Sequence, residues 1–369
     1  MSSFQTTTIQ LSLTTDCSMR CKYCYSYHKP EYLTKEAFDN GFFEKVHKIM
    51  DIWGTSSYHV SLFGGEPTMN WDIIEYVVPK LREDPKCIWI NLITNGSLID
   101  DYKADFILNN NISTTLSFDG IWSKESRPLA DGSDSFENYM SKMPLYEKIH
   151  ANIKTMLAPR FFNTLAENFE FFVTQTPFKN PDFSLIRDDI YTKRYIETYE
   201  KELPRLTDKI LELMYKGYRC TCGLHDLYLK DTLAGKRFGK RQHGCFAGHH
   251  GCVYTTKGEL YPCERYSARK QFQLMDINGN PNLENIKKLQ YYANPHNYEE
   301  CKQCELREVC NAGCTWSEMQ QNKFEGVSPL SSLCQIFKIT YKEAFRLLKL
   351  APNWYREYLD NHVRPGNMG

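Results

Sequence analysis

The sequence has no excess charge of either sign, because 45 lysine and arginine residues are balanced by 45 aspartate and glutamate residues over 369 positions. Proteins whose main partner is nucleic acid or an anionic membrane usually carry a positive field, so we expect neither partner here. No run of about 18 apolar residues is present, so no membrane-spanning helix is predicted. The first residues, MSSFQTTTIQLSL, also lack the basic start and apolar middle of a signal peptide. These absences predict a cytoplasmic protein.

Cysteine, by contrast, is abundant, with 14 residues. Disulfides rarely persist in a reducing cytoplasm, so cysteines in this number are expected to be metal ligands. Three of them, Cys17, Cys21 and Cys24, stand close together in TTDCSMRCKYCYSY, and most of the others lie between residues 220 and 334. The sequence therefore predicts two separate groups of metal ligands.

Short β-rich runs alternate with amphipathic segments up to about residue 190. The expected strands are 7–14, 57–63, 87–94, 112–118, 151–157 and 182–186. The expected helices cover 34–50, 70–83, 100–110, 135–149 and 163–173. Such alternation is typical of parallel βα units. Six units predict an α/β fold, a partial (β/α)6 barrel that is open on one side.

The second half of the chain has a different character. A polar helical stretch is expected at 188–216, and after Gly217 the sequence becomes rich in Cys, Gly, His and Asn with little periodicity. A segment of this kind does not build an ordinary hydrophobic core, so we expect bound metal to help stabilise it. A last helix is expected at 335–349. The predicted domains are a barrel at 1–190, a helical bridge at 191–240, a cysteine-rich domain at 241–340, and a C-terminal helix and tail at 341–369.

An unusual loop follows each of the first four expected strands. The three-cysteine loop follows the first strand, GGEP (64–67) the second, TNG (94–96) the third and DG (119–120) the fourth. Active residues of such barrels gather on the loops at the carboxyl ends of the strands. We therefore expect these four loops to share one rim.

Three thiolates can hold three irons of a four-iron, four-sulfur cluster and leave the fourth iron able to bind a ligand. A tetrahedral zinc site would want a fourth Cys or His nearby, and His28 is the local candidate. Structural packing of the three cysteines without metal is the remaining alternative.

Cys17-x3-Cys21-x2-Cys24, with Tyr23 before the last cysteine, resembles the signature of the radical S-adenosylmethionine (SAM) enzymes. The resemblance implies that the open iron binds the amino and carboxylate groups of S-adenosylmethionine and that Tyr23 lies at the cofactor site. It also implies reductive cleavage of this molecule to a 5′-deoxyadenosyl radical that abstracts hydrogen from substrate.

GGEP fits the second motif of that family. Glycines 64 and 65 would let the backbone approach the ligand closely, since they have no Cβ. The resemblance implies that Glu66 and the surrounding backbone meet the methionine amino group. A tight turn closed by Pro67 is the alternative reading of these four residues.

Four more residues acquire expected roles from the same resemblance. NLITNG is similar to the family strand that lines the cofactor, with Asn95 near the ribose. LSFDG is similar to the next strand, with Ser117 and Asp119 pointing toward the site. Arg127, in ESRPLADGSDSFEN, matches a family arginine that pairs with the methionine carboxylate. Each of these residues could instead be a turn former or a surface charge.

The C-terminal cysteines resemble the seven-cysteine SPASM domain found in one radical SAM subfamily. The pattern is C-x12-G-x4-C, then C-x2-C-x5-C-x3-C, then a distant cysteine. The resemblance implies two auxiliary four-iron clusters and hence three clusters in all. It assigns Cys301, Cys304, Cys310 and Cys334 to an outer cluster and Cys245, Cys263 and Cys314 to an inner one. Taken without the upstream loop, CxxC units would suit zinc equally well.

The other four cysteines lie outside this pattern. Cys252, at the start of an expected strand, could be the fourth ligand of the inner cluster or a buried free thiol. Cys220 and Cys222, in RCTCG, have no assigned role, and Cys87 opens an apolar strand and is expected in the core.

Glu264 directly follows Cys263, at the place where sulfatase-activating relatives carry an aspartate that is proposed as the base. The carboxylate is kept here but is one methylene longer, which matters because a base must lie within hydrogen-bond distance of its proton. Pairing with Arg265 or Arg269 is the alternative.

Together the resemblances predict a maturase that oxidises a ribosomally made precursor peptide and forms a carbon–carbon, carbon–oxygen or thioether crosslink. The alternatives are an anaerobic sulfatase-maturating enzyme, which converts Cys or Ser to formylglycine, and a non-catalytic iron–sulfur redox carrier. The implied reductant is of the flavodoxin or ferredoxin type. Because the first strand is expected by about residue 7, no leader-recognition domain is expected ahead of it, and either a separate leader-binding protein or the barrel itself would receive the precursor.

Overall fold

The computed structural model describes residues 6–26, 30–187, 191–238, 246–267, 269–292, 294, 297–307, 309–310, 314–323 and 331–362. The chain forms two compact units, which are treated separately below. Unit 1 comprises Met1–Ser117, Lys124–Ala151 and Phe246–Ala293. Unit 2 comprises Phe118–Ser123, Asn152–Cys245 and Asn294–Gly369.

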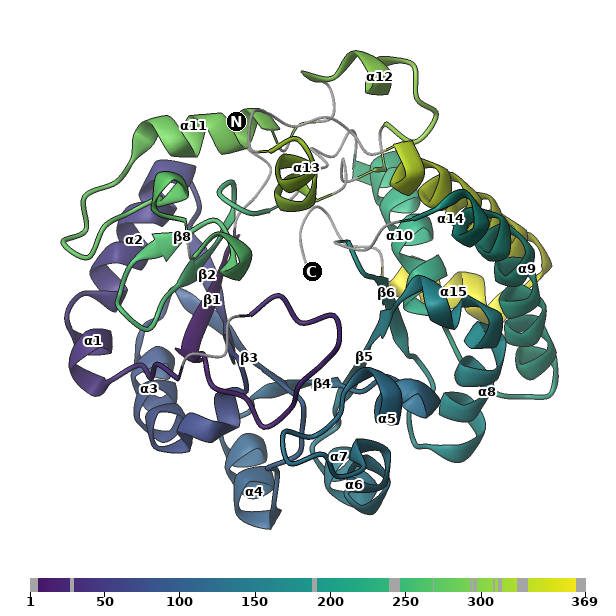
Figure 1. Ribbon diagram of the computed structural model, residues 1–369, viewed down its shortest axis with the longest axis horizontal. Coiled ribbons are helices and arrows are strands. Elements are labelled where there is room, and N and C mark those ends of the chain that lie inside the picture. Colours follow the sequence, from purple (N-terminus) through teal and green to yellow (C-terminus); the bar gives the residue numbers. More distant parts are fainter. Residues whose placement is uncertain are drawn as a thin grey trace. The chain divides into compact units, whose positions relative to one another are not determined.

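The centre of unit 1 is a sheet of mostly parallel strands (Figure 1). Its strands are β1 (Thr6–Thr14), β2 (Ser57–Gly64), β3 (Cys87–Thr94), β4 (Ser113–Ser117), β7 (Gly251–Tyr254) and β8 (Leu260–Tyr261). Within the unit their order is β4-β3-β2-β1-β7-β8. The pairs from β4 through β1 to β7 are parallel, and β8 runs antiparallel to β7. Because β1 is paired on both edges, the loop that follows it starts from the middle of the sheet.

Helices follow the strands of unit 1 and carry an apolar stripe against the sheet. They are α1 (Lys35–Asp39), α2 (Phe42–Trp53), η1 (Pro67–Asn70), α3 (Trp71–Glu83), α4 (Asp101–Asn109), α6 (Ser135–Ser141), α7 (Met143–Lys148), η4 (Glu264–Tyr266), η5 (Lys270–Phe272) and α11 (Leu283–Tyr292). In α2, for example, Val46, Ile49 and Met50 are buried, a three-to-four residue spacing that places them on one face. Between β4 and α6 the chain also forms η2 (Gly120–Trp122) and α5 (Ser123–Ser126).

Unit 2 contains two parallel strands and a group of longer helices. The strands are β5 (Asn152–Leu157) and β6 (Asp182–Leu185). The helices are η3 (Pro159–Thr164), α8 (Leu165–Gln175), α9 (Lys193–Tyr215), α10 (Gly223–Phe238), α12 (Glu299–Lys302), α13 (Thr315–Gln321), α14 (Ser331–Leu350) and α15 (Asn353–His362).

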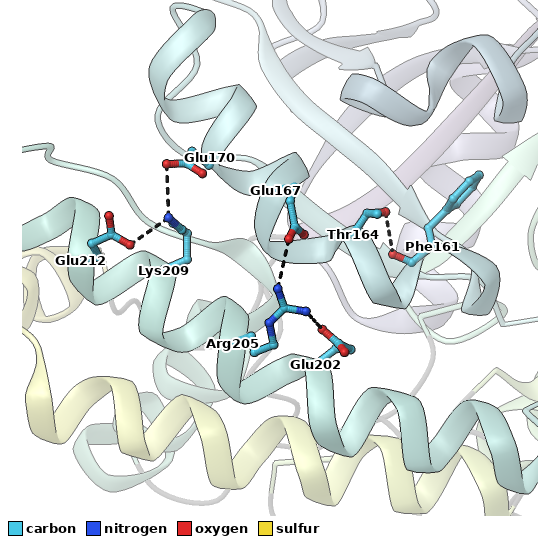
Figure 2. A network of polar contacts seen from close by, with 8 residues as sticks. All are labelled: Phe161, Thr164, Glu167, Glu170, Glu202, Arg205, Lys209 and Glu212. Atoms are coloured by element: carbon cyan, nitrogen blue, oxygen red, sulfur yellow. Dashed lines mark hydrogen bonds and ion pairs between the residues drawn. The ribbon is translucent and has the colours of Figure 1, made fainter.

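Ion pairs fasten α9 to α8 along the solvent side of their contact (Figure 2). Lys209 Nζ lies 3.2 Å from Glu170 Oε1 on α8 and 2.8 Å from Glu212 Oε2 on its own helix. Arg205 bridges in the same way between Glu167 of α8, at 3.2 Å, and Glu202. Exposed pairs of this kind contribute about 0–1 kcal/mol each, so they set the register of the two helices more than their stability.

The predicted alternation of six strands and helices is confirmed, as is the α/β class. The structure divides two of the predicted helices, however. The helix expected at 34–50 is broken at Gly41, whose φ of 107° lies outside the helical range, and the helix expected at 135–149 is broken at Lys142. Pro144 follows that break in the first turn of α7, where its missing N–H costs no hydrogen bond.

The prediction of an irregular second half is wrong in two places. α11 forms where little periodicity was expected, and α15 occupies part of the predicted tail, whereas α10 lies within the helical bridge predicted at 191–240. The strand expected near Cys252 is present as β7, and it extends the sheet of unit 1 beside β1.

Candidate active site

The three-cysteine loop leaves the end of β1 and is held by backbone hydrogen bonds on two sides. On the β2 side, the N–H groups of Gly65 and Glu66 donate to Thr14 O and Asp16 O, both at 2.7 Å. On the other side, Arg20 N donates to Pro128 O at 2.8 Å, and Lys22 N donates to Ser126 O at 2.9 Å. The loop between Cys17 and Cys24 is therefore fixed by its neighbours as well as by any metal it binds.

The two glycines of GGEP are required by contact with this loop. A Cβ on Gly64 would lie 2.2 Å from Thr14 O, and one on Gly65 would lie 2.2 Å from Asp16 O. Gly64 also has a φ of 144°, which side-chain-bearing residues rarely adopt. We expected these glycines to admit a ligand, and the structure shows that they admit the backbone of the cysteine loop.

Glu66 lies at the centre of the rim and is only 1% exposed. Its Oε1 accepts hydrogen bonds from Thr68 N at 3.1 Å, Thr68 Oγ1 at 2.5 Å and Thr94 Oγ1 at 2.6 Å. Its Oε2 accepts from Asn95 N at 2.7 Å. Burial raises the pKa of Glu66, and the four hydrogen bonds act in the opposite direction. The carboxylate thus ties GGEP to TNG, and these bonds occupy most of its acceptor capacity.

Asn95 connects TNG to the cysteine loop. Its Nδ2 lies 3.0 Å from Ser18 Oγ and 3.8 Å from Cys17 Sγ, and its Oδ1 accepts from Ser97 N at 2.9 Å. Ser18 and Ser97 also bond to each other through their hydroxyls, at 2.8 Å. The predicted meeting of the first and third loops is therefore present in unit 1.

Arg127 lies against the same loop. Its Nη1 is 3.8 Å from Cys21 Sγ, and its guanidinium carbon lies 5.2 Å from the centroid of the Tyr23 ring. The arginine is 6% exposed, so its positive charge is buried beside the predicted cluster ligands. A buried cation here would favour a thiolate or a carboxylate.

The fourth predicted rim loop is divided between the two units. Ser117 ends β4 in unit 1, where its carbonyl accepts from Tyr139 Oη at 2.7 Å. Asp119 belongs to unit 2, is fully buried and accepts from Met156 N at 2.8 Å. That contact holds β5 and accounts for the burial of this carboxylate.

Three cysteine thiols are donors of the kind that an iron–sulfur cluster takes. Among the described residues no three His, Cys, Asp or Glu side chains are grouped closely enough to hold one metal ion. Zinc ligands at about 2.3 Å from the metal would bring their sulfurs to about 4 Å from one another. Cluster thiolates bind different irons and stand farther apart. His28, the alternative zinc ligand, lies outside the described residues.

Without a bound metal the thiol of Cys17 is held protonated. Burial raises the pKa of Cys17 to about 12, and the nearby Glu66 carboxylate, Cys21 and Cys24 add to the effect. Met19 N, 3.4 Å from Cys17 Sγ, opposes it by donating to the sulfur. Metal binding at Cys17 must therefore release a proton.

Glu264 and its neighbours form a second polar group in unit 1. Burial raises the pKa of Glu264 to about 7, and its Oε2 is buried with no hydrogen-bond partner among the described residues. Arg265 instead stacks on Tyr25, with its guanidinium carbon 4.0 Å from the ring centroid. The described contacts of Glu264 include no ion pair with Arg265 or Arg269. Burial raises the pKa of Tyr25, and its electrostatic neighbours include Arg265, Cys263, Glu264 and Cys24, so the cysteine loop and Glu264 border the same ring.

Four of the C-terminal cysteines lie together in unit 2. The pKa of Cys334 on α14 is raised to about 11, mainly by burial and then by Cys310 and Cys304. The pKa of Cys301 on α12 is raised to about 11 by burial and then by Cys334 and Cys304. These are the four residues that the sequence assigns to the outer cluster.

The remaining cysteines are placed individually. Cys263 precedes η4 in unit 1, Cys314 caps α13 in unit 2, and Cys245 lies outside the described residues. Cys252 is 2% exposed on β7 opposite Ile9 of β1, the surroundings of a buried thiol. Cys220 and Cys222 are fully buried in unit 2. Cys87 is buried, as predicted for a core position.

Sequence reasoning missed the residues that join the rim loops to one another. Thr68, Thr94, Ser18 and Ser97 supply hydroxyl groups to this network. All four stand within two residues of a recognised motif residue, which is the signal that could have found them.

Comparison with known proteins agrees with this geometry. The Radical SAM superfamily model matches residues 11–157, the stretch that holds the cysteine loop, GGEP, TNG and Arg127. Residues 11–157 therefore form a radical SAM domain.

Relatives extend the similarity over nearly the whole length of the chain. It is 25% identical to a cysteine-type anaerobic sulfatase-maturating enzyme from Clostridium perfringens (strain ATCC 13124), over 91% of this chain and 96% of that protein. It is 24% identical to the radical SAM cyclopropyl synthase TigE from Paramaledivibacter caminithermalis, over 95% of this chain and 76% of that protein.

The fold is shared with solved structures. Native anSMEcpe with bound AdoMet and Cp18Cys peptide has a TM-score of 0.74 at 23% identity, covering 95% of this chain and 99% of that one. Streptococcus suis SuiB bound to its precursor peptide SuiA has a TM-score of 0.60 at 15% identity, covering 89% of this chain and 76% of that one.

Among the described residues, no helix is long and apolar enough to cross a membrane.

Proposed function

We propose that this chain is a radical SAM maturase that oxidises a peptide or protein substrate, with a ribosomally made precursor peptide as the favoured substrate. The observation that supports this proposal most directly is the rim in unit 1, where hydrogen bonds join the three-cysteine loop to both GGEP and TNG. An electron carrier would have no need of such a rim, which in this superfamily serves S-adenosylmethionine. The two peptide-bound neighbours, anSMEcpe and SuiB, support a peptide substrate.

Cys17, Cys21 and Cys24 would hold a four-iron cluster with one open iron. Such a cluster supplies the electron that cleaves S-adenosylmethionine and so yields the radical that removes hydrogen from substrate. In unit 1, Arg127 offers a buried cation to a carboxylate of the bound molecule. Glu66 and the two glycines keep the loops around it in place, and the ring of Tyr23 lies against Arg127. Pro67 begins η1 directly after Glu66 and ends the rim turn. Asn95 and Ser117 stand at the ends of β3 and β4, as the resemblance implies for cofactor contacts, and Asp119 is the least supported of that set.

The C-terminal cysteines would hold two auxiliary clusters. Cys304 and Cys310 raise the pKa of Cys334, and Cys304 and Cys334 raise that of Cys301, which supports one ligand set in unit 2. Cys245, Cys263 and Cys314 remain the proposed ligands of the second set, and the burial of Cys252 on β7 favours its reading as a free thiol. We retain 241–340 as the proposed SPASM segment, between the helical bridge and the last helices.

Glu264 is proposed to accept the proton that the substrate loses as it is oxidised. Its support is geometric, since Oε2 is buried with no hydrogen-bond partner in the described part of the chain, and the residue is next to a proposed cluster ligand. Replacing Glu264 by Gln removes this acceptor and keeps the size of the side chain. We expect the Gln variant to cleave S-adenosylmethionine but to release less oxidised product, whereas Glu284→Gln on the exposed start of α11 should behave as wild type.

The deciding experiment uses anaerobically reconstituted protein, a flavodoxin or ferredoxin-type reductant, and candidate peptides with or without a separate leader-binding protein. Release of 5′-deoxyadenosine establishes the enzyme and excludes the carrier. Mass spectrometry then follows the peptide, and a loss of two hydrogens without an aldehyde indicates a crosslink.

The second candidate is the sulfatase-maturating reaction, which the match over 96% of the clostridial enzyme favours. It predicts formylglycine at a Cys or Ser, which an aldehyde-reactive hydroxylamine probe would trap. Zinc in place of iron and sulfide, or no cleavage of S-adenosylmethionine after reduction, would contradict both reactions.

A further inference from the structure

The side-chain amide of Asn95 has only one orientation that satisfies its surroundings. Its backbone N–H donates to Glu66 Oε2 at 2.7 Å, which fixes the residue at the end of β3. Its Oδ1 accepts from Ser97 N at 2.9 Å. A flipped amide would place an NH2 group against that backbone N–H, so the hydrogen-bond network excludes it. The donor end of Asn95 therefore faces the cysteine loop.

The two hydrogens of Nδ2 have two acceptors there. Ser18 Oγ lies at 3.0 Å and Cys17 Sγ at 3.8 Å, a length at which sulfur still accepts a hydrogen bond. Asn95 is 6% exposed, so water competes little for these hydrogens. Cys17 Sγ also receives the Met19 N–H at 3.4 Å.

The three cysteines of the loop are not equivalent in this respect. Cys17 is partly buried and receives two N–H groups, and Cys21 receives Arg127 Nη1 at 3.8 Å, whereas Cys24 is exposed and no described residue donates to its sulfur. Asn95 is thus the uncharged side chain among the described donors to these sulfurs.

We propose that Asn95 is a positioning residue for the cluster, which donates an N–H···S hydrogen bond to the Cys17 thiolate and raises the reduction potential. This departs from the ribose contact that the family resemblance implies, and it rests on the proposed cluster being bound. The physical reason is that a reduced cluster carries more negative charge on its sulfurs. A donor aimed at a ligand sulfur therefore stabilises the reduced state more than the oxidised one.

The test is a potentiometric titration followed by electron paramagnetic resonance, without S-adenosylmethionine. Auxiliary-cluster cysteines are replaced in the background so that only the Cys17 cluster is observed. We expect Asn95→Ala to shift the reduction equilibrium by about tenfold toward the oxidised state, which is about 59 mV for one electron. Ser18→Ala is the matched control, because it removes the other acceptor of Nδ2 and leaves the donor to Cys17. It should keep the wild-type potential.

The two roles of Asn95 predict different outcomes. An unchanged potential in Asn95→Ala, together with weaker binding of S-adenosylmethionine, would overturn the proposal in favour of a ribose contact. Pulsed electron paramagnetic resonance on wild-type protein labelled with ¹⁵N-asparagine gives a second test that needs no variant. A ¹⁵N coupling to the reduced cluster is expected, and its absence would overturn the proposal. Wild-type protein that holds no cluster would refute the proposed function itself, and this inference with it.

Discussion

Replacing Glu66 by Gln should destabilise the protein even when no cofactor is present. The carboxylate is buried and accepts two backbone N–H groups, from Thr68 on Oε1 and from Asn95 on Oε2. A Gln amide has one acceptor oxygen, so whichever way it is turned, one of these backbone donors loses its partner. A buried unsatisfied donor costs about 1–3 kcal/mol. The three remaining hydrogen bonds weaken without the charge, while the cost of burying a charge is relieved. We therefore expect a net loss of about 1–3 kcal/mol.

Urea denaturation of cofactor-free protein, followed by far-ultraviolet circular dichroism, measures this change. Glu83→Gln is a suitable control, because Glu83 is an exposed carboxylate at the end of α3 and its replacement should stay within about 0.5 kcal/mol of wild type. If Glu66 instead served only to bind the methionine amino group, cofactor-free Glu66→Gln would match this control and only affinity for S-adenosylmethionine would fall. That result would refute the structural role assigned to this carboxylate.

Four further predictions follow from other sites. Cys24→Ala should lower the iron content of reconstituted protein by about four per chain, measured by a colorimetric iron assay alongside acid-labile sulfide. Cys334→Ser should cause a similar loss while leaving the Cys24 cluster spectrum intact, and full iron retention would contradict its place in a ligand set. Gly65→Ala should lower the melting temperature, because its Cβ would lie 2.2 Å from Asp16 O, and the two atoms can separate only if the backbone moves. Burial lowers the pKa of His225 from 6.5 to about 3, so as the pH drops from 6.5 toward 3 the unfolded chain takes up a proton before the folded one and stability should fall. In His225→Asn the urea midpoint should therefore depend less on pH between 7.5 and 5 than in wild type. The same pH dependence in both proteins would contradict this prediction.

Local patterns in the sequence predicted most of the barrel half. Strands such as 87–94 were predicted at their observed bounds because apolar β-rich runs end at polar turn residues. Helix breaks at Gly41 and Lys142 were missed, since the apolar periodicity continues across both positions. α15 was not predicted because the end of the chain was interpreted from its polar residues. Tertiary contacts in unit 2 bury Leu359 and override that local composition.

The site was predicted as a set of residues but not as a network. The ends of parallel strands predicted that the loops of Cys17, Glu66 and Asn95 share one rim, and the family resemblance added Arg127 and the expected role of each residue. Their partners were not predictable from spacing. Whether Glu66 faces a ligand or four hydroxyl and backbone N–H donors depends on side-chain directions, and these follow only once β2 and β3 are in register.

β7 comes from the C-terminal half of the chain but is part of the sheet formed by the N-terminal half. Its backbone pairs with β1 from Thr8 to Leu11, so a segment far away in sequence occupies one edge of the strand that leads into the cysteine loop. A shortened protein that stops before residue 246 would leave that edge of β1 without hydrogen bonds and would uncover apolar side chains there. Exchange of this half between related enzymes should therefore carry β7 along with the cysteines, or the recipient barrel will be prone to aggregate.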